Sequence, residues 1–74
     1  KAEQILAALG GSDNILDLEP CITRLRVEVE DPSLIDDDAL KAAGAFGIVH
    51  QGNAVQVVVG PEADNLAEDI EDIR

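Results

Sequence analysis

The sequence is poor in aromatic residues and holds a single cysteine. Phe46 is the only aromatic residue among 74, so the core must be built from Val, Ile, Leu and Ala. Cys21 alone cannot form an internal disulfide, and a reducing cytoplasm therefore suits the chain better than an oxidising compartment. No apolar run approaches the roughly 20 residues that span a bilayer, and no signal-peptide pattern occurs. The sequence predicts a cytoplasmic domain without direct membrane insertion.

Basic residues are also scarce. Five Lys and Arg stand against sixteen Asp and Glu, which gives a formal net charge of -11. Nucleic acid and anionic membrane surfaces repel such a chain, so we expect no nucleic-acid partner. The acidity suits docking onto a basic or apolar patch of a partner, or serves solubility alone.

The length limits what the chain can enclose. We expect residues 1–74 to form a single domain with a small core. A deep substrate pocket with a lid does not fit in that volume. The length therefore favours a module that meets its substrate on another protein.

Hydrophobic periodicity predicts the order helix, two strands, helix, two strands, helix. The expected helices cover residues 2–9, 39–43 and 61–73, and the expected strands cover 14–20, 22–30, 46–51 and 54–59. The Gly-Asn pair at 52–53 predicts a two-residue hairpin that sets residue 51 opposite residue 54. The residues of this hairpin expected to face the core are Phe46, Ile48, His50, Val55, Val57 and Val59. We expect an α+β fold, a four-stranded antiparallel sheet covered on one face by three helices.

Three consecutive aspartates, Asp36, Asp37 and Asp38, precede the helical segment that starts at Ala39. Acids at a helix start satisfy free N–H groups and the positive end of the dipole, so we expect a helix cap. A calcium loop is the alternative, but the alternating ligand spacing and the terminal Glu are missing. We expect no metal and no cofactor.

The candidate chemistry is concentrated around Cys21. Arg24 and Arg26 lie within five positions of this residue, on one solvent face of a strand with period two. Neighbouring cations favour the nucleophilic thiolate, and two guanidinium groups on one face can bind phosphate oxygens. Cys21 itself is expected in a turn after Pro20. The alternative is a small buried cysteine beside two solvated arginines.

Residues 14–27 closely resemble the phosphorylation-site segment of the enzyme IIB domain in the glucose family of the bacterial phosphoenolpyruvate-dependent sugar phosphotransferase system (PTS). The string C-x-T-R-L-R at 21–26 carries the resemblance, which extends through G-A-F-G at 44–47 to G-P at 60–61. Family members often have small or polar residues ahead of the cysteine, where this chain has Glu19 and Pro20.

The resemblance implies a ping-pong phosphoryl relay. A phosphohistidine of a IIA partner would charge Cys21, the covalent nucleophile, and the phosphoryl group would pass to a hexose or amino sugar held by the membrane-embedded IIC partner. Arg24 and Arg26 would stabilise the transferred charge. Ile22 and Thr23, with the backbone N–H groups of the turn, would bind the phosphate oxygens. Such a domain works at the inner face of the cell membrane.

Two other protein classes fit part of the pattern. An acyl carrier protein has this size and acidity, and the segment at 31–34 partly matches an Asp-Ser-Leu attachment site at Ser33. Carriers are helical bundles, however, whereas the valines of 55–59 favour a strand. A thiol redox sensor would use Cys21 but lacks a resolving cysteine. His50 is expected to be a partly buried structural residue beside the hairpin tip.

Overall fold

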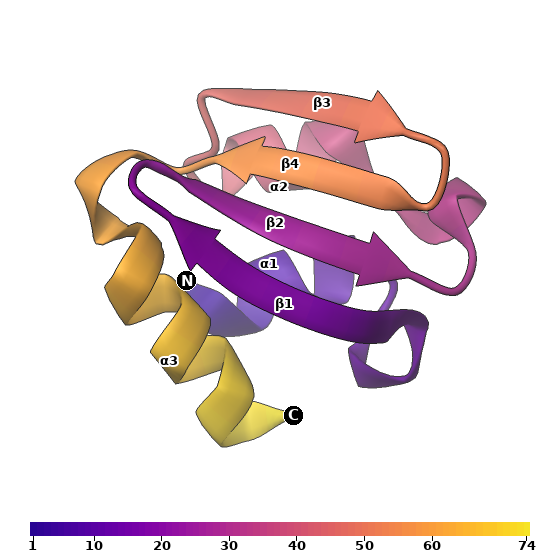
Figure 1. Ribbon diagram of the computed structural model, residues 1–74, viewed down its shortest axis with the longest axis horizontal. Coiled ribbons are helices and arrows are strands. Elements are labelled where there is room, and N and C mark those ends of the chain that lie inside the picture. The colour runs from indigo at the N-terminus through magenta and orange to yellow at the C-terminus, as the bar shows by residue number, and fades with distance from the viewer.

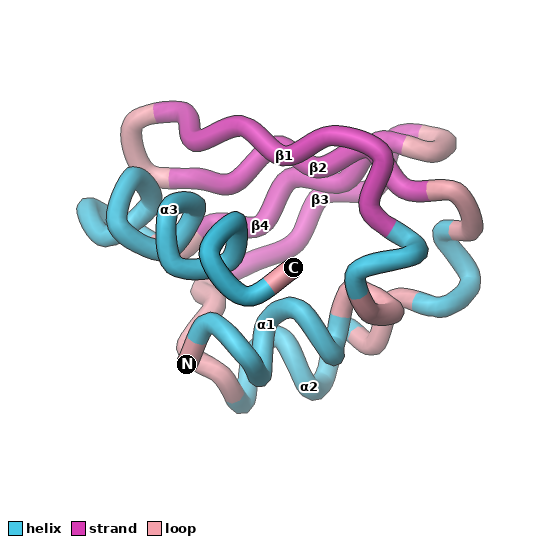
Figure 2. The backbone as a smooth tube through the Cα atoms, turned by 90° about the horizontal axis from the view of Figure 1, so that it is seen from below, coloured by secondary structure: helices cyan, strands magenta, loops and turns pink.

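Three helices cover one face of a four-stranded antiparallel sheet in the computed structural model, which describes all 74 residues (Figures 1 and 2). The strands lie in the order β1-β2-β4-β3. The elements are α1 (Ala2–Ala8), β1 (Ile15–Cys21), β2 (Arg24–Val29), α2 (Asp37–Ala42), β3 (Gly47–Gln51), β4 (Ala54–Val58) and α3 (Ala63–Ile73). The predicted fold class and element order are confirmed, and the helical-bundle alternative is wrong.

Strand β2 shows how the sequence pattern separates the two faces of the sheet. Leu25, Val27 and Val29 are fully buried, while the residues between them are exposed. The buried side chains pack beneath the helices, because alternate residues of a strand point to opposite faces. Figure 2 shows all three helices on this side of the sheet. The opposite side, which we call the open face, is left uncovered.

The Gly-Asn turn sets the predicted register of the second hairpin. Gln51 lies opposite Ala54, and the pairing runs back to Gly47 opposite Val58. Strand β4 also pairs with β2, so the hairpin joins the first two strands through its second strand.

The aspartates before α2 act as the predicted cap. The Asp36 side chain accepts a 3.1 Å hydrogen bond from the Ala39 N–H. A second carboxylate works in the same way at Pro32–Leu34, where Asp31 accepts hydrogen bonds from the N–H and the hydroxyl of Ser33. These two bonds lower the pKa of Asp31 below its ordinary value, since they stabilise the charged form.

Asn14 is the one buried polar residue, with 3% of its surface exposed. Its Nδ2 donates to the Leu9 carbonyl at 2.7 Å and to the Asp31 carbonyl at 3.1 Å. Its Oδ1 accepts from the Asp31 N–H at 2.8 Å. One amide therefore joins the segment after α1 to the segment after β2.

Two predicted core positions are wrong. Phe46 is 77% exposed, because it precedes β3 and its ring lies over the surface of Gly60. Helical spacing predicts a buried stripe on α3 made of Ala63, Leu66, Ala67, Ile70 and Ile73. The first four are buried, but Ile73, at the last turn, is 44% exposed. None of the helices has the length and hydrophobicity that a bilayer span requires.

Candidate functional site

Cys21 is the last residue of β1, not a turn residue as predicted. It lies opposite Arg24, the first residue of β2, and the turn between them consists of Ile22 and Thr23. The strand continues through Pro20 because β1 is an edge strand, where a residue without an N–H is tolerated. The cysteine is exposed. The interpretation of Cys21 as a buried cysteine is therefore wrong.

The turn beside the cysteine has an unusual backbone. Ile22 has φ of +52° and is the only non-glycine residue with positive φ. A β-branched residue in this region is a genuine outlier, and a left-handed residue costs roughly 1–2 kcal/mol. Its side chain is also 85% exposed. Neither the conformation nor the exposure of Ile22 favours the folded state.

The same turn is attached to the start of the last helix. The Thr23 carbonyl accepts hydrogen bonds from the N–H groups of Val59, at 2.9 Å, and Gly60, at 2.8 Å. Figure 1 shows the tip of the β1–β2 hairpin beside the segment that enters α3. Gly60 itself has φ of +81°, a conformation that favours glycine.

The candidate site residues lie in rows on the open face. Directly opposed residues of an antiparallel pair point to the same side, and so do alternate residues of one strand. The first row runs Cys21, Arg24, Val58, Gly47; the second runs Glu19, Arg26, Gln56, Val49; the third runs Asp17, Glu28, Ala54, Gln51. The thiol therefore has an arginine across the strand and a carboxylate along it.

Both arginines keep their charge free of direct ion pairs. Arg24 donates from Nη1 to Oε1 of Gln56 at 2.6 Å, which draws its guanidinium toward β4, on the side of β2 away from Cys21. Arg26 lines a hollow of about 200 Å³ whose other lining residues are Asp17, Glu19 and Glu28. The three ion pairs of the structure all involve other residues. An anion on Cys21 would therefore lie opposite Arg24, which has no carboxylate partner, and diagonal to Arg26, which three carboxylates surround without a close ion pair.

Sequence reasoning missed Gln56. The only signal was a polar residue within the valine run of β4. The predicted hairpin register placed Gln56 opposite Val49 on β3. No local sequence pattern predicts the pairing of β4 with β2. The contact with Arg24 followed only from that pairing.

His50 lies away from this site. It points to the helix side of the sheet, opposite Val55, and its Nε2 is 2.9 Å from Oδ1 of Asp37 in the first turn of α2. Its side chain is 40% exposed, in line with the expected partial burial. The sequence had shown no titratable partner for it.

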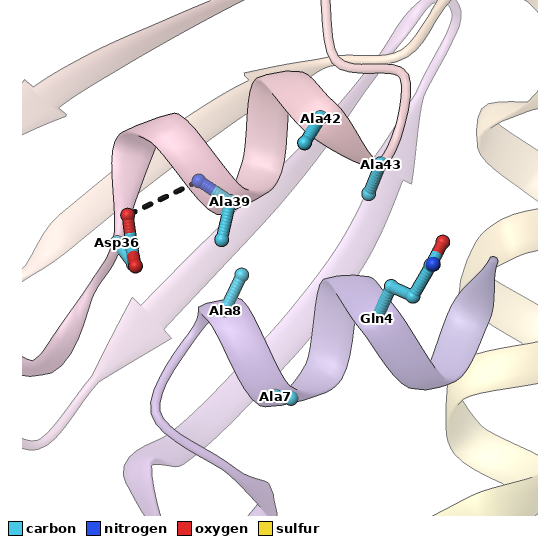
Figure 3. A pocket seen from close by; sticks show the side chains of 7 residues that line it. All are labelled: Gln4, Ala7, Ala8, Asp36, Ala39, Ala42 and Ala43. Atoms are coloured by element: carbon cyan, nitrogen blue, oxygen red, sulfur yellow. Dashed lines mark hydrogen bonds between the residues drawn. The ribbon is translucent and has the colours of Figure 1, made fainter.

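The largest hollow is also remote from the cysteine. It is a groove of about 450 Å³ between α1 and α2, lined mainly by alanines, with Gln4 and Asp36 as the polar lining residues (Figure 3). Figure 3 shows Ala8 of α1 and Ala39 of α2 pointing toward one another across the groove. No nucleophile or cation lines this groove.

A family model described as phosphotransferase system, EIIB, matches residues 3–36. A curated relative, the PTS system N-acetylglucosamine-specific EIIB component of Streptomyces coelicolor, is 60% identical over 73 residues, which are 99% of this chain and 95% of the relative. The crystal structure of one domain of a PTS system IIabc component from Clostridium difficile superposes with a TM-score of 0.80 at 26% identity, covering 97% of this chain and 76% of that chain.

Two longer relatives contain a matching segment. The PTS system glucoside-specific EIICBA component of Staphylococcus carnosus is 46% identical over 70 residues, which are 95% of this chain and 10% of the relative. The PTS system alpha-glucoside-specific EIICB component of Leptotrichia buccalis is 50% identical over 74 residues, 99% of this chain and 14% of the relative. This chain therefore spans a small part of each of these two proteins.

Proposed function

The chain belongs to the glucose-family EIIB components of the phosphotransferase system, and from this premise we propose that it relays a phosphoryl group through Cys21 during sugar uptake. The observation that carries the proposal is the position of Cys21, exposed on the open face at the end of an edge strand and opposite Arg24. A relay residue must be reached by two partners in turn, and this position is open to both.

In the first step, the Cys21 thiolate attacks the phosphorus of a phosphohistidine on a IIA partner. The S–P bond forms, the N–P bond breaks, and the imidazole nitrogen leaves with the electron pair. Cysteine is an effective covalent nucleophile because its thiolate is intrinsically reactive. The exposed edge position lets the donor approach in line with the bond that breaks.

In the second step, a hydroxyl oxygen of a sugar bound to a membrane IIC partner attacks the same phosphorus. The O–P bond forms, the S–P bond breaks, the thiolate leaves with the electron pair, and the hydroxyl proton passes to a base of the partner or to water. Phosphoryl transfer depends mainly on positioning and on charge stabilisation, so a small domain suffices. The chain then works at the cytoplasmic side of the membrane.

The groups around the cysteine have distinct parts in this proposal. Arg24 and Arg26 neutralise the charge of the phosphoryl group, and the fork of N–H donors suits its oxygens. The N–H groups of Ile22 and Thr23 complete the site at the turn. Gln56 competes with the phosphate for Arg24, because it accepts a hydrogen bond from Nη1 of this guanidinium.

The sugar is proposed to be a hexose or an amino sugar. N-acetylglucosamine is the first to test, because it is in the name of the relative that is 60% identical. Selection among sugars lies with the IIC partner, which holds the substrate.

The test is to incubate the chain with phosphoenolpyruvate, the general PTS proteins and a IIA domain, then to map the modified residue by mass spectrometry at neutral pH. We expect one phosphoryl group on Cys21, and none on Cys21→Ser. Phosphate on His50 instead, or none on the wild type with an active IIA domain, would overturn the proposal.

A further inference from the structure

Arg26 has two kinds of acceptor within reach. Directly opposed residues of an antiparallel pair have Cβ atoms about 5 Å apart, and diagonal ones about 7–8 Å. Glu19 is directly opposite Arg26, while Cys21 and Asp17 are its diagonal neighbours on β1. Glu28 lies two residues along β2 on the same face. A phosphoryl group on Cys21 would therefore compete with carboxylates for this guanidinium.

The local charge favours the carboxylates before any phosphate arrives. The hollow around Arg26 is lined by Asp17, Glu19 and Glu28 and by no apolar residue. Three negative charges and one positive charge leave a local net charge of -2 (1 - 3). None of the three carboxylates forms a close ion pair with Arg26. The guanidinium is thus attracted by all three without being fixed by one.

We propose that Glu19, supported by Asp17 and Glu28, draws Arg26 away from phosphocysteine and thereby lowers the stability of the phosphorylated form. The idea rests on the proposed relay function. In the exchange with the donor, an N–P bond is replaced by an S–P bond, and the equilibrium depends on how well each protein stabilises the phosphoryl group. If both arginines contacted the phosphoryl group fully, the group would tend to stay on Cys21. Glu19 weakens one contact, so the group remains transferable to the sugar.

Glu19 is a positioning residue in this proposal, acting through Arg26. The measurement is the equilibrium ratio of phosphorylated chain to phosphorylated IIA domain, with a IIA domain charged from phosphoenolpyruvate as the donor. We expect Glu19→Gln to raise the ratio about threefold, and Glu28→Gln about twofold, as for unit charges several ångströms apart in a water-like dielectric. Glu19→Asp, which keeps the charge, should stay near wild type.

Three controls separate this effect from a general one. Glu68→Gln makes the same charge change on the exposed surface of α3, in the helix layer, and should leave the ratio unchanged. The effect of Glu19→Gln should shrink in high salt, because exposed charges are screened. It should also largely disappear in an Arg26→Ala background.

Two results would overturn the inference and leave the relay function standing. One is a ratio for Glu19→Gln equal to that of the wild type; the other is an equal increase with and without Arg26. Failure of the wild type to accept phosphate at all would instead contradict the proposed function.

Discussion

Arg24 donates a 2.6 Å hydrogen bond from Nη1 to Oε1 of Gln56. Gln56 lies on β4, and Cys21 lies on β1, on the other side of β2. The acceptor is a neutral amide and the bond is exposed, so the charge of Arg24 is not neutralised. An exposed hydrogen bond of this kind contributes about 1 kcal/mol, less than an arginine gains from a doubly charged phosphate. The bond therefore holds Arg24 only until a stronger acceptor appears.

Substitutions of Gln56 should act in opposite directions according to charge. Gln56→Ala removes the competing acceptor and should raise the single-turnover rate of Cys21 phosphorylation about twofold. Gln56→Glu replaces the amide with a carboxylate that pairs with Arg24, and should lower the rate about threefold or more. Rapid-quench transfer from a phosphorylated IIA domain measures both. Gln51→Glu, in the third row of the open face, is the matched control and should change little.

Removal of either arginine should affect the second transfer more than the first. In the proposed relay, the phosphohistidine partner brings its own site to the charging step, whereas the step to sugar relies on Arg24 and Arg26 to stabilise the charge of the transition state. Arg24→Ala and Arg26→Ala should each lower sugar phosphorylation at least tenfold while Cys21 is still charged. Replacing either arginine with lysine should restore sugar phosphorylation only in part, since lysine lacks the bidentate fork of N–H donors. Full sugar phosphorylation by both alanine variants would show that the assigned role is wrong.

Ile22→Gly should make the domain more stable. Glycine removes the cost of positive φ at this position, partly offset by its greater freedom in the unfolded chain. We expect a gain of roughly 0.5–1 kcal/mol, which corresponds to about 2–8 °C in the midpoint of thermal unfolding. Ile22→Val keeps the branched side chain and should not shift the midpoint. A lower midpoint for the glycine variant would mean that the side chain makes stabilising contacts despite its exposure.

Asn14→Ala should be strongly destabilising. The change removes three hydrogen bonds and leaves the Leu9 carbonyl and the Asp31 N–H without their buried partner. Unsatisfied buried groups of this kind cost about 2–4 kcal/mol in total. Urea unfolding followed by circular dichroism measures the loss. Asn65→Ala, at an exposed position of α3, is the control and should stay within about 0.5 kcal/mol of wild type.

The sequence predicted the parts of the fold that local patterns determine. Alternation around Leu25 and Val27 identified the buried face of β2, and the Gly-Asn pair gave the register of the second hairpin. The cap at Asp36 followed from its position before an apolar segment. In each case the feature depends on residues that are close in the sequence, so the local pattern is enough to predict it.

The rest depended on contacts between distant segments. The pairing of β2 with β4 brings Gln56 to Arg24, and no local signal specifies it. Phe46 was expected to face the core from the hairpin register, but β3 starts only at Gly47 and the Phe46 side chain is exposed. Cys21 was expected in a turn because proline usually ends a strand, a rule that an edge strand relaxes.

The two hydrogen bonds that hold the Thr23 carbonyl bear on how fast partners can associate. They fix the tip of the β1–β2 hairpin to the segment that leads into α3, so the turn beside Cys21 is already ordered before a partner binds. Binding to a preformed target includes no ordering of a loop, and its rate is then set by diffusion and orientation. In the proposed relay, this preformed turn would be available both to the phosphoryl donor and to the acceptor, with no rearrangement between the two encounters.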